Sequence, residues 1–215
     1  MLILASSSPY RRALLERLGL PFRVLVPDFE ELRPGGGHTL EALVRANALG
    51  KARSLAPHHP HSLVIGSDQV AERDGRILTK PGSAERAVAQ LLSLCDAEHR
   101  LWTALVLLRH DPPWERCRVI AGRLRIRPLT RREAEAYVAR EQPLDCAGAY
   151  KSEGLGITLF DYLRSDDPTA IIGLPLVALS ALLREAGCDP LDPGPDDAKP
   201  QRLDDRRMRN EEEAE

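Results

Sequence analysis

Apolar residues recur at two different spacings along the 215-residue chain. Short apolar or alternating runs are typical of strands, whereas apolar residues three or four positions apart mark one face of a helix. These patterns predict strands at 2–5, 22–26, 63–65, 101–108, 116–126 and 171–172, and a hairpin over 70–77 that turns at Asp74-Gly75. They predict helices at 9–18, 39–56, 83–94, 130–141 and 175–185. This alternation predicts an α/β fold.

The C-terminal residues differ in composition from the rest of the chain. From Asp192 to Glu215 there are nine acidic and five basic residues, which gives this segment a charge of −4. The net charge of the whole chain is −2, so the rest of the chain carries +2. Its sizeable apolar residues are Leu203 and Met208, too few to offset the entropy lost on ordering. We predict one folded domain over 1–190 and a disordered tail over 191–215, with a helix within 203–213 as the alternative.

Composition narrows the class of protein. With 43% hydrophobic residues a core can form without disulfides, and a net charge of −2 argues against a protein that coats nucleic acid. The four cysteines form no CxxC or Cys/His spacing, which favours reduced thiols in the cytoplasm over a zinc site. We find neither a signal peptide nor an apolar stretch of about 18 residues, so we expect no membrane span.

The first predicted strand leads into a helix through Ser6-Ser7-Ser8-Pro9. Ser8 suits the N-cap and Pro9 the first helical position. Free N–H groups at such a helix start favour an anion, and Arg11 and Arg12 add forked donors in the first turn. The sequence therefore indicates either a phosphate site or an ordinary Ser-Pro cap with solvated arginines.

Two acidic and two basic side chains stand near the ends of predicted elements. Asp68 follows the apolar run 63–65, so we expect it at the carboxyl end of a core strand, where ligands of open α/β sheets bind. There it could hold Mg²⁺ or Mn²⁺ or accept a proton from water, or it could merely cap a turn. Glu31, Lys51 and Lys80 would complete a metal-and-polyphosphate site if the fold brought them together; each alone is commonly a solvated charge.

Taken in order, these segments resemble the Maf family of nucleoside triphosphate pyrophosphatases. The resemblance spans residues 1 to about 190, and its strength lies in the ordered set rather than in any one piece. The matching residues are Leu2–Pro9 with Arg11-Arg12, Glu30-Glu31, Lys51-Ala52, Ile65–Val70, Lys80–Gly82, His99, Thr103, Pro143–Gly154 and Gly173–Leu176. Thr79 and Ala104 replace glycines usual in the family, which affects loop shape and removes no charged group.

The resemblance implies a fold and a reaction. The fold is a mixed central sheet flanked by helices, with two lobes around a nucleotide cleft, commonly in a homodimer. The reaction is hydrolysis between the α- and β-phosphates with Mg²⁺ or Mn²⁺, giving a monophosphate and pyrophosphate. Asp68 would activate water, and Glu31 with Asp68 would hold the metal. The residues implied to line the phosphates are Ser6, Ser8, Arg11, Arg12, Lys51 and Lys80.

Three positions resemble the subgroup that hydrolyses 7-methyl-GTP, namely Tyr10, Gln69 and Glu153. N7-methylation gives guanine a positive charge, which an aromatic face attracts by roughly 0.5–2 kcal/mol. Glu153 could accept from the guanine N1–H and amine and offset that charge, while Gln69 would shape the pocket. The alternative is that Tyr10 caps a core edge and that Glu153 is solvated.

Two other functions stay open at this stage. One is a pyrophosphatase of the same family that acts on dTTP and UTP, against which Tyr10 and Glu153 argue. The other is a nucleotide-binding regulator of cell division without useful turnover. The presence of Asp68, Glu31, Lys51 and Lys80 favours catalysis, because a pure sensor has no need of a water-activating acid.

Overall fold

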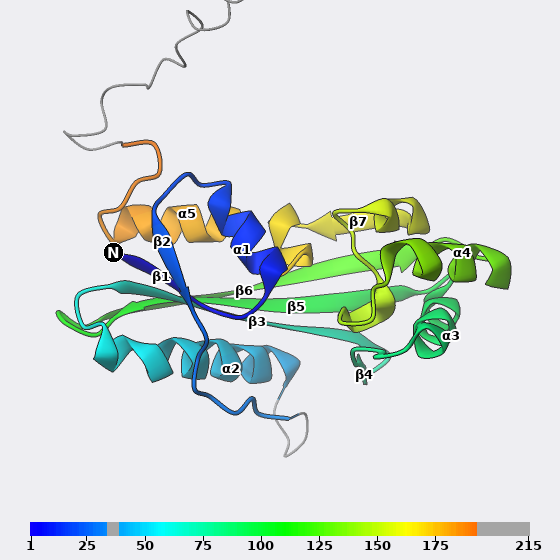
Figure 1. The fold of residues 1–215 in the computed structure, drawn as a ribbon, viewed down its shortest axis with the longest axis horizontal. Coiled ribbons are helices and arrows are strands. Elements are labelled where there is room, and N and C mark those ends of the chain that lie inside the picture. Colours follow the sequence, from blue (N-terminus) through cyan, green and yellow to red (C-terminus); the bar gives the residue numbers. More distant parts are fainter. Residues whose placement is uncertain (34–38, 193–215) are drawn as a thin grey trace, which may run out of the picture.

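A mixed β-sheet runs the length of the molecule, with helices packed on both of its faces (Figure 1). The computed structural model describes residues 1–33 and 39–192. The strands are β1 (Leu2–Ala5), β2 (Phe22–Leu25), β3 (Leu63–Arg73), β4 (Arg76–Leu78), β5 (Glu98–Arg109), β6 (Trp114–Ile126) and β7 (Phe160–Ser165). The α-helices are α1 (Pro9–Glu16), α2 (Leu40–Leu55), α3 (Ala84–Leu94), α4 (Arg131–Glu141) and α5 (Leu176–Glu185).

The sheet is parallel at one end and antiparallel at the other. The strand order is β2-β1-β3-β5-β6-β7, and β4 pairs with β3 outside this path. β1 is parallel to both β2 and β3, and it ends at Ala5, which is in register with Gly66. β3 continues beyond that point in antiparallel register with β5. Past Gly66 the strand β3 therefore has β5 on one side and no β1 on the other.

The prediction that Asp68 ends a strand is wrong. β3 is one strand from Leu63 to Arg73, and Asp68 lies in its middle, in register with Ala104 of β5. Pairing with β5 supplies backbone hydrogen bonds all along this polar stretch, and these override its weak strand propensity. Asp68 still lies just past the end of the parallel strands, which is where the sheet opens.

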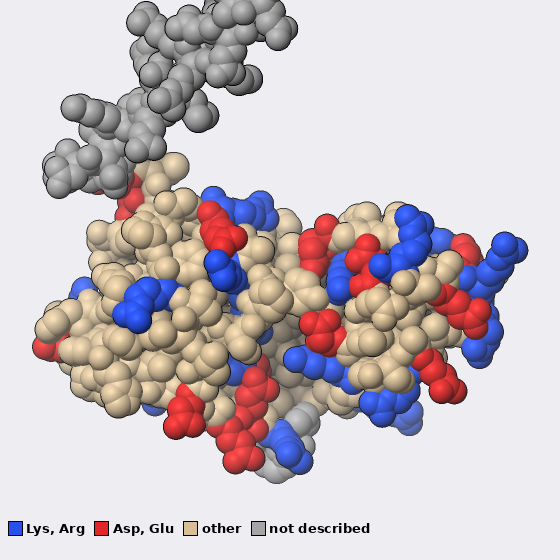
Figure 2. Space-filling model, in the orientation of Figure 1, with Lys and Arg blue, Asp and Glu red and all other residues tan. Residues whose placement is uncertain are grey.

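The hydrophobic core is divided between the two halves of the sheet. In the half with the parallel strands, α2 packs on one face around Val44, Ala48 and Val106, and α1 and α5 pack on the other. In the other half, α3 and α4 pack with β5 and β6 around Leu91 and Leu101. Figure 2 shows a hollow in the surface between the halves. This arrangement agrees with the two lobes that the resemblance implies.

Apart from β3, the other predicted helices and strands agree with the structure to within about three residues at their ends, except near the C-terminal end. Residues 171–172 form no strand: Ile171 ends a 3₁₀ helix, η4 (Pro168–Ile171), and the last strand is β7, which we did not predict. β7 reads Phe-Asp-Tyr-Leu-Arg-Ser, and its polar residues lower its strand propensity. The predicted tail falls almost wholly on residues 193–215, outside the described residues. In the described part of the chain, no helix has the length and apolar character needed to span a membrane.

Candidate active site

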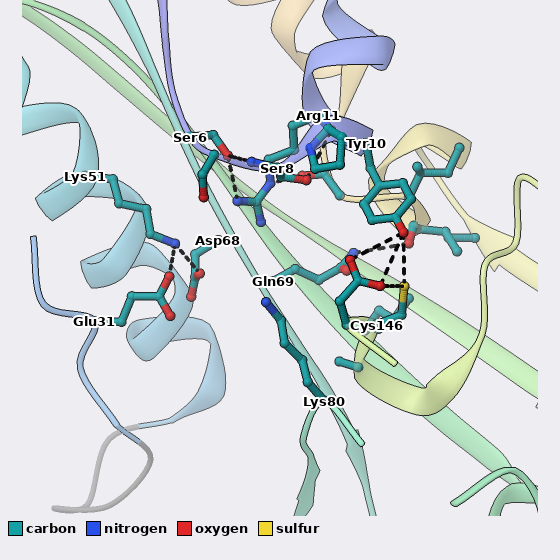
Figure 3. A pocket seen from close by; sticks show the side chains of 18 of the residues that line it. Ser6, Ser8, Tyr10, Arg11, Glu31, Lys51, Asp68, Gln69, Lys80 and Cys146 are labelled. Carbon is teal, nitrogen blue, oxygen red and sulfur yellow. Dashed lines mark hydrogen bonds and ion pairs between the residues drawn. The ribbon is translucent and has the colours of Figure 1, made fainter. Parts of the chain in front are cut away.

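A cleft of about 570 Å³ opens where β1 ends and β3 continues. Its volume lies within the usual range for small-molecule sites. Figure 3 shows Glu31, Lys51 and Asp68 at one end of it, Tyr10 and Cys146 at the other, and Gln69 and Lys80 between them. Of the predicted site residues, the cleft is lined by Ser6, Ser8, Tyr10, Arg11, Glu31, Lys51, Asp68, Gln69, Lys80 and Glu153.

Lys51 joins two carboxylates at the first end of the cleft. Its Nζ lies 2.7 Å from Oδ1 of Asp68 and 2.5 Å from Oε1 of Glu31. Lys51 and Asp68 are only 6% and 5% exposed, so their attraction is weakly screened by solvent. Burial works to raise the pKa of Glu31, but the Lys51 hydrogen bond and the charges of Lys51, Arg11 and Lys80 outweigh it, so this pKa lies below its ordinary value.

Two glycines bring α2 and the Glu31 loop close enough for these contacts. A Cβ on Gly66 of β3 would lie 2.1 Å from the carbonyl oxygen of Ala48, and one on Gly50 of α2 would lie 2.2 Å from the ring of Phe29. Side chains cannot be accommodated at such distances, so α2 packs directly on β3 and Phe29 packs directly on α2. The close packing places Lys51 over the middle of β3, and the chain just after Phe29 carries Glu31.

Asn47 is a site residue that the sequence analysis missed. It is 3% exposed, and its Nδ2 donates to Oδ2 of Asp68 at 3.1 Å and to the carbonyl of Leu32 at 3.2 Å. Its Oδ1 accepts from the Leu32 N–H at 2.8 Å. Asn47 thus ties the chain beside Glu31 to the Asp68 carboxylate. The available signal was its spacing: Asn47 and Lys51 are four residues apart, on one face of a helix whose other buried residues are apolar or small.

The Ser-rich turn is organised around the start of α1. Ser8 is the N-cap and its Oγ accepts from the Arg11 N–H, as predicted, while its own N–H donates to Oγ of Ser6 at 3.1 Å. Nε of Arg11 donates to the Gly173 carbonyl at 2.9 Å, which turns the guanidinium into the cleft (Figure 3). Burial lowers the pKa of Arg11, and the carboxylates of Asp68 and Glu31 oppose that shift. A guanidinium remains charged in such surroundings.

The remaining basic residues divide between the cleft and the surface. Lys80 follows β4 and lines the cleft, and no acidic side chain among the described residues pairs with it. Arg12 does not line the cleft: its Nε donates to Glu16 one turn along α1 at 3.0 Å, and its side chain is 63% exposed. The structure therefore brings together the predicted phosphate-binding residues except Arg12.

Gln69 is engaged with the wall of the cleft. Its Nε2 donates to Oγ1 of Thr103 at 2.9 Å and to the carbonyls of Ala170 and Ile171 at 2.7 and 3.2 Å. Thr103 also donates to Ala170 at 2.9 Å. These contacts hold the segment that continues to Ile172 and Gly173, both of which line the cleft. Gln69 therefore shapes the pocket indirectly, by holding the segment that forms one wall of the cleft.

Tyr10 heads a hydrogen-bonded group at the opposite end of the cleft. Its Oη lies 3.4 Å from both carboxylate oxygens of Asp145, and the Cys146 thiol lies 3.5 Å from Oδ1 of Asp145. Burial is the main cause that raises the pKa of Tyr10 and that of Cys146, the latter to about 11. Both groups stay protonated as donors. Glu153 is exposed and lines the same cleft.

A buried pair supports this end from behind. Tyr150 lines the cleft, and its Oη lies 2.8 Å from Nε2 of His99, which is 1% exposed. Burial lowers the pKa of His99 to about 4, and the charge of Arg73 adds to the shift. At neutral pH His99 is therefore an uncharged partner that fixes the Tyr150 ring.

The donor set at the first end is compatible with a divalent metal that also binds substrate. The described residues contain no group of three or more His, Cys, Asp or Glu side chains able to hold a metal ion. The carboxylates of Glu31 and Asp68, however, are brought together because each contacts Nζ of Lys51 through one oxygen. Mg²⁺ commonly uses one or two carboxylates and completes its shell with water and substrate phosphates, so two carboxylates suffice.

The comparisons with known proteins agree over the whole folded part of the chain. A family model described as "Maf-like protein" matches residues 1–186. Proteins named "7-methyl-GTP pyrophosphatase" from Polaromonas sp. and Bordetella avium are 48% and 49% identical, over 86% and 88% of this chain and 84% and 95% of their own. One from Burkholderia orbicola is 50% identical over 86% of this chain and 89% of its own.

Among solved structures, the Staphylococcus aureus Ham1 protein is similar over 58% of this chain and 71% of its own. Its sequence identity is 17% and its TM-score 0.41. A likeness this slight supports no argument about the site.

Proposed function

Because the chain belongs to the Maf-like protein family, we propose that it is a nucleoside triphosphate pyrophosphatase that hydrolyses 7-methyl-GTP to 7-methyl-GMP and pyrophosphate. The observation that carries this proposal is one cleft with Asp68, held by Lys51 and Asn47, at one end, Lys80 between the ends and Tyr10 at the other. Arg11 and Glu153 line the same cleft. The relatives' printed names supply the substrate.

Asp68 is proposed as the base that activates water. Oδ1 and Oδ2 each receive one hydrogen bond, from Lys51 and Asn47 respectively. A carboxylate has about four acceptor sites, so capacity remains for a water molecule. That water's oxygen would bond to phosphorus as its proton passes to Asp68, the bridge between the α- and β-phosphates breaks, and pyrophosphate leaves.

The cations of the cleft are proposed to hold the phosphates. Arg11 and Lys80 line the cleft without an acidic ion-pair partner among the described residues, so their charges are available to phosphate oxygens. At the start of α1, the Tyr10 N–H has no hydrogen-bond partner among the described residues and adds one donor. Catalysis of phosphoryl transfer depends largely on positioning and charge neutralisation, which these groups supply.

We propose that Glu31 and Asp68 hold a divalent cation, Mg²⁺ or Mn²⁺, together with substrate oxygens. When bound, such an ion neutralises negative charge on the phosphates. The convergence of the two carboxylates supports this assignment. Lys51 orients both carboxylates whether or not the ion is present.

We also propose that the protein acts in the cytoplasm as a homodimer. Cys95, Cys117, Cys146 and Cys188 are all free thiols, as is common in reducing compartments. The resemblance to the family is the support for the dimer. Light scattering during size-exclusion chromatography would test it, and a mass near that of a single 23.8 kDa chain would contradict it.

A substrate panel tests the proposed function. Purified protein with Mg²⁺ or Mn²⁺ is mixed with 7-methyl-GTP, GTP, dTTP or UTP, and pyrophosphate release is measured. We expect kcat/KM to be highest for 7-methyl-GTP. Equal values on all four would contradict the substrate but not the enzyme class, whereas release from none would contradict the enzyme class.

A further inference from the structure

The charged residues that line the cleft are unevenly distributed along it. Arg11, Lys51 and Lys80 are its cationic lining residues, and Figure 3 shows Lys51 at the Asp68 end and Lys80 between the two ends. The charged residues that the segment 145–153 adds to the lining are both acidic, Asp145 and Glu153. In Figure 3, Tyr10 and Cys146 mark this second end, opposite Lys51 and Asp68. The cations therefore lie at the Asp68 end and between the two ends, where Lys51 is already paired with Asp68 and Glu31, whereas the segment 145–153 adds only negative charge to the lining.

Four of the charged residues that line the cleft form no ion pair with another residue of the described chain. Across residues 1–33 and 39–192, no ion pair involves Arg11, Lys80, Asp145 or Glu153. Unpaired opposite charges at the two ends set up a field along the cleft. A ligand that is negative at one end and positive at the other gains attraction at both.

Asp145 is held in place without being neutralised. It accepts from the Tyr10 hydroxyl and the Cys146 thiol, two donors that remain protonated and uncharged. The nearby Lys151 does not line the cleft: its Nζ donates to the Glu141 carbonyl at 2.7 Å and lies 5.9 Å from the centroid of the Tyr10 ring, so it offsets part of the negative charge at this end without forming an ion pair with Asp145. The negative charge of Asp145 is therefore available to whatever occupies this end.

We infer that the cleft selects nucleoside triphosphates whose base carries a positive charge, and that Asp145 is a specificity-determining residue alongside Glu153. The inference rests on the proposed pyrophosphatase function and widens its substrate class. N7-methylguanine belongs to this class, and so does N1-methyladenine, which is also a cation at neutral pH. The reaction is the same for each: water adds at phosphorus, the bridge between α- and β-phosphates breaks, and the methylated monophosphate and pyrophosphate leave.

The test compares two pairs of nucleotides that differ by one methyl group and one charge. Wild-type protein is assayed at pH 7 with 7-methyl-GTP and GTP, and with 1-methyl-ATP and ATP, and kcat/KM is expressed as the methylated-to-unmethylated ratio for each pair. We expect both ratios to exceed about ten. In Asp145→Asn, which keeps the shape and one acceptor oxygen, we expect both to fall about fivefold.

The matched control is Asp161→Asn. Asp161 is an exposed carboxylate on β7 that pairs with Arg125 and does not line the cleft. It should leave both ratios at their wild-type values, and thermal melts of both variants establish that they fold. Unchanged ratios in Asp145→Asn would overturn the role of Asp145, and a ratio near one for the adenine pair would overturn the wider class.

Binding separates this inference from the proposed function. Dissociation constants for the same four nucleotides are measured by calorimetry on wild-type protein, Asp145→Asn and Asp161→Asn. If no nucleotide releases pyrophosphate, the proposed function fails, and the Kd ratios still decide the inference. Tighter binding of both methylated nucleotides, weakened about fivefold by Asp145→Asn, would support it, and equal binding within each pair would overturn it.

Discussion

Asp68 and Asp145 line the same cleft but differ in exposure, in the length of their hydrogen bonds and in the charge of their donors. Asp68 is 5% exposed and receives two hydrogen bonds, 2.7 Å from Lys51 and 3.1 Å from Asn47. Asp145 is exposed and has long contacts to neutral donors. A fixed, desolvated carboxylate suits chemistry that depends on positioning. A carboxylate with an uncompensated charge suits discrimination between charged and uncharged ligands.

The largest expected effect on activity comes from removing the charge of Asp68 at the buried end of the cleft. Asp68→Asn keeps the volume but removes the charge and the proton acceptor, so we expect kcat to fall by about a thousandfold or more. Nucleotide binding should largely survive, because Arg11 and Lys80 still hold the phosphates. Pyrophosphate release measures the first quantity and calorimetry the second. Activity within about tenfold of wild type would remove Asp68 from its proposed role.

A substitution of Asn47 tests whether kcat depends on the hydrogen bond that positions the Asp68 carboxylate. Asn47→Leu removes the donor to Asp68 and both hydrogen bonds to Leu32, so we expect kcat to fall about ten- to hundredfold. The preference for 7-methyl-GTP over GTP should not change, because Asn47 bonds to Asp68, which lies at the opposite end of the cleft from Tyr10 in Figure 3. Steady-state kinetics on both substrates separates the two quantities.

The control for Asn47→Leu lies on the same helix. Ser54→Ala removes one hydrogen bond, from Ser54 to the Lys51 carbonyl at 3.0 Å, and leaves the contacts of Asp68 in place. It should retain wild-type kcat. If Asn47→Leu lost stability in a thermal melt but kept its kcat, Asn47 would be structural only. Asn47→Asp, which retains an acceptor for the Leu32 N–H but loses both donors, should still lose kcat if the hydrogen bond to Asp68 matters.

The two ends also differ in how far the sequence could predict them. The turn at Ser8 and Pro9 follows local rules, and the structure confirms it. The placement of Asp68 depends on β1 ending four residues into its pairing with β3 while β5 continues. Strand pairing of this kind involves residues far apart in sequence, so periodicity within one segment cannot show it.

Side-chain direction limited the prediction for single residues. Arg11 and Arg12 are equivalent in the sequence, but consecutive helix positions point about 100° apart, and only Arg11 turns into the cleft. Asp145 belongs to the matching segment Pro143–Gly154, but its contact with Tyr10, which lies 135 residues earlier, cannot be predicted from that segment. The resemblance to a family placed Tyr10, Gln69 and Glu153 at the site, and the structure adds that Gln69 acts through the wall.

The smallest expected effect sharpens the contrast at the exposed end. Glu153→Gln removes an exposed charge while keeping the shape of the side chain, and an exposed charge pair contributes up to about 1 kcal/mol, or about fivefold. We therefore expect the ratio of kcat/KM for 7-methyl-GTP to that for GTP to fall by about fivefold or less.

Added salt tests the same prediction in a second way, because it screens the charges at the exposed end of the cleft more than those at the buried end. The Debye length falls from about 10 Å at 0.1 M salt to about 3 Å at 1 M. Both substrates carry the same triphosphate, so screening of the phosphates cancels in the ratio, and its loss with salt reports on the base alone. The wild-type ratio should fall with added salt, and that of Glu153→Gln should fall less. If the two ratios fell in parallel, the preference would not depend on the charge of Glu153, and shape or hydrogen bonding at Tyr10 would have to account for it.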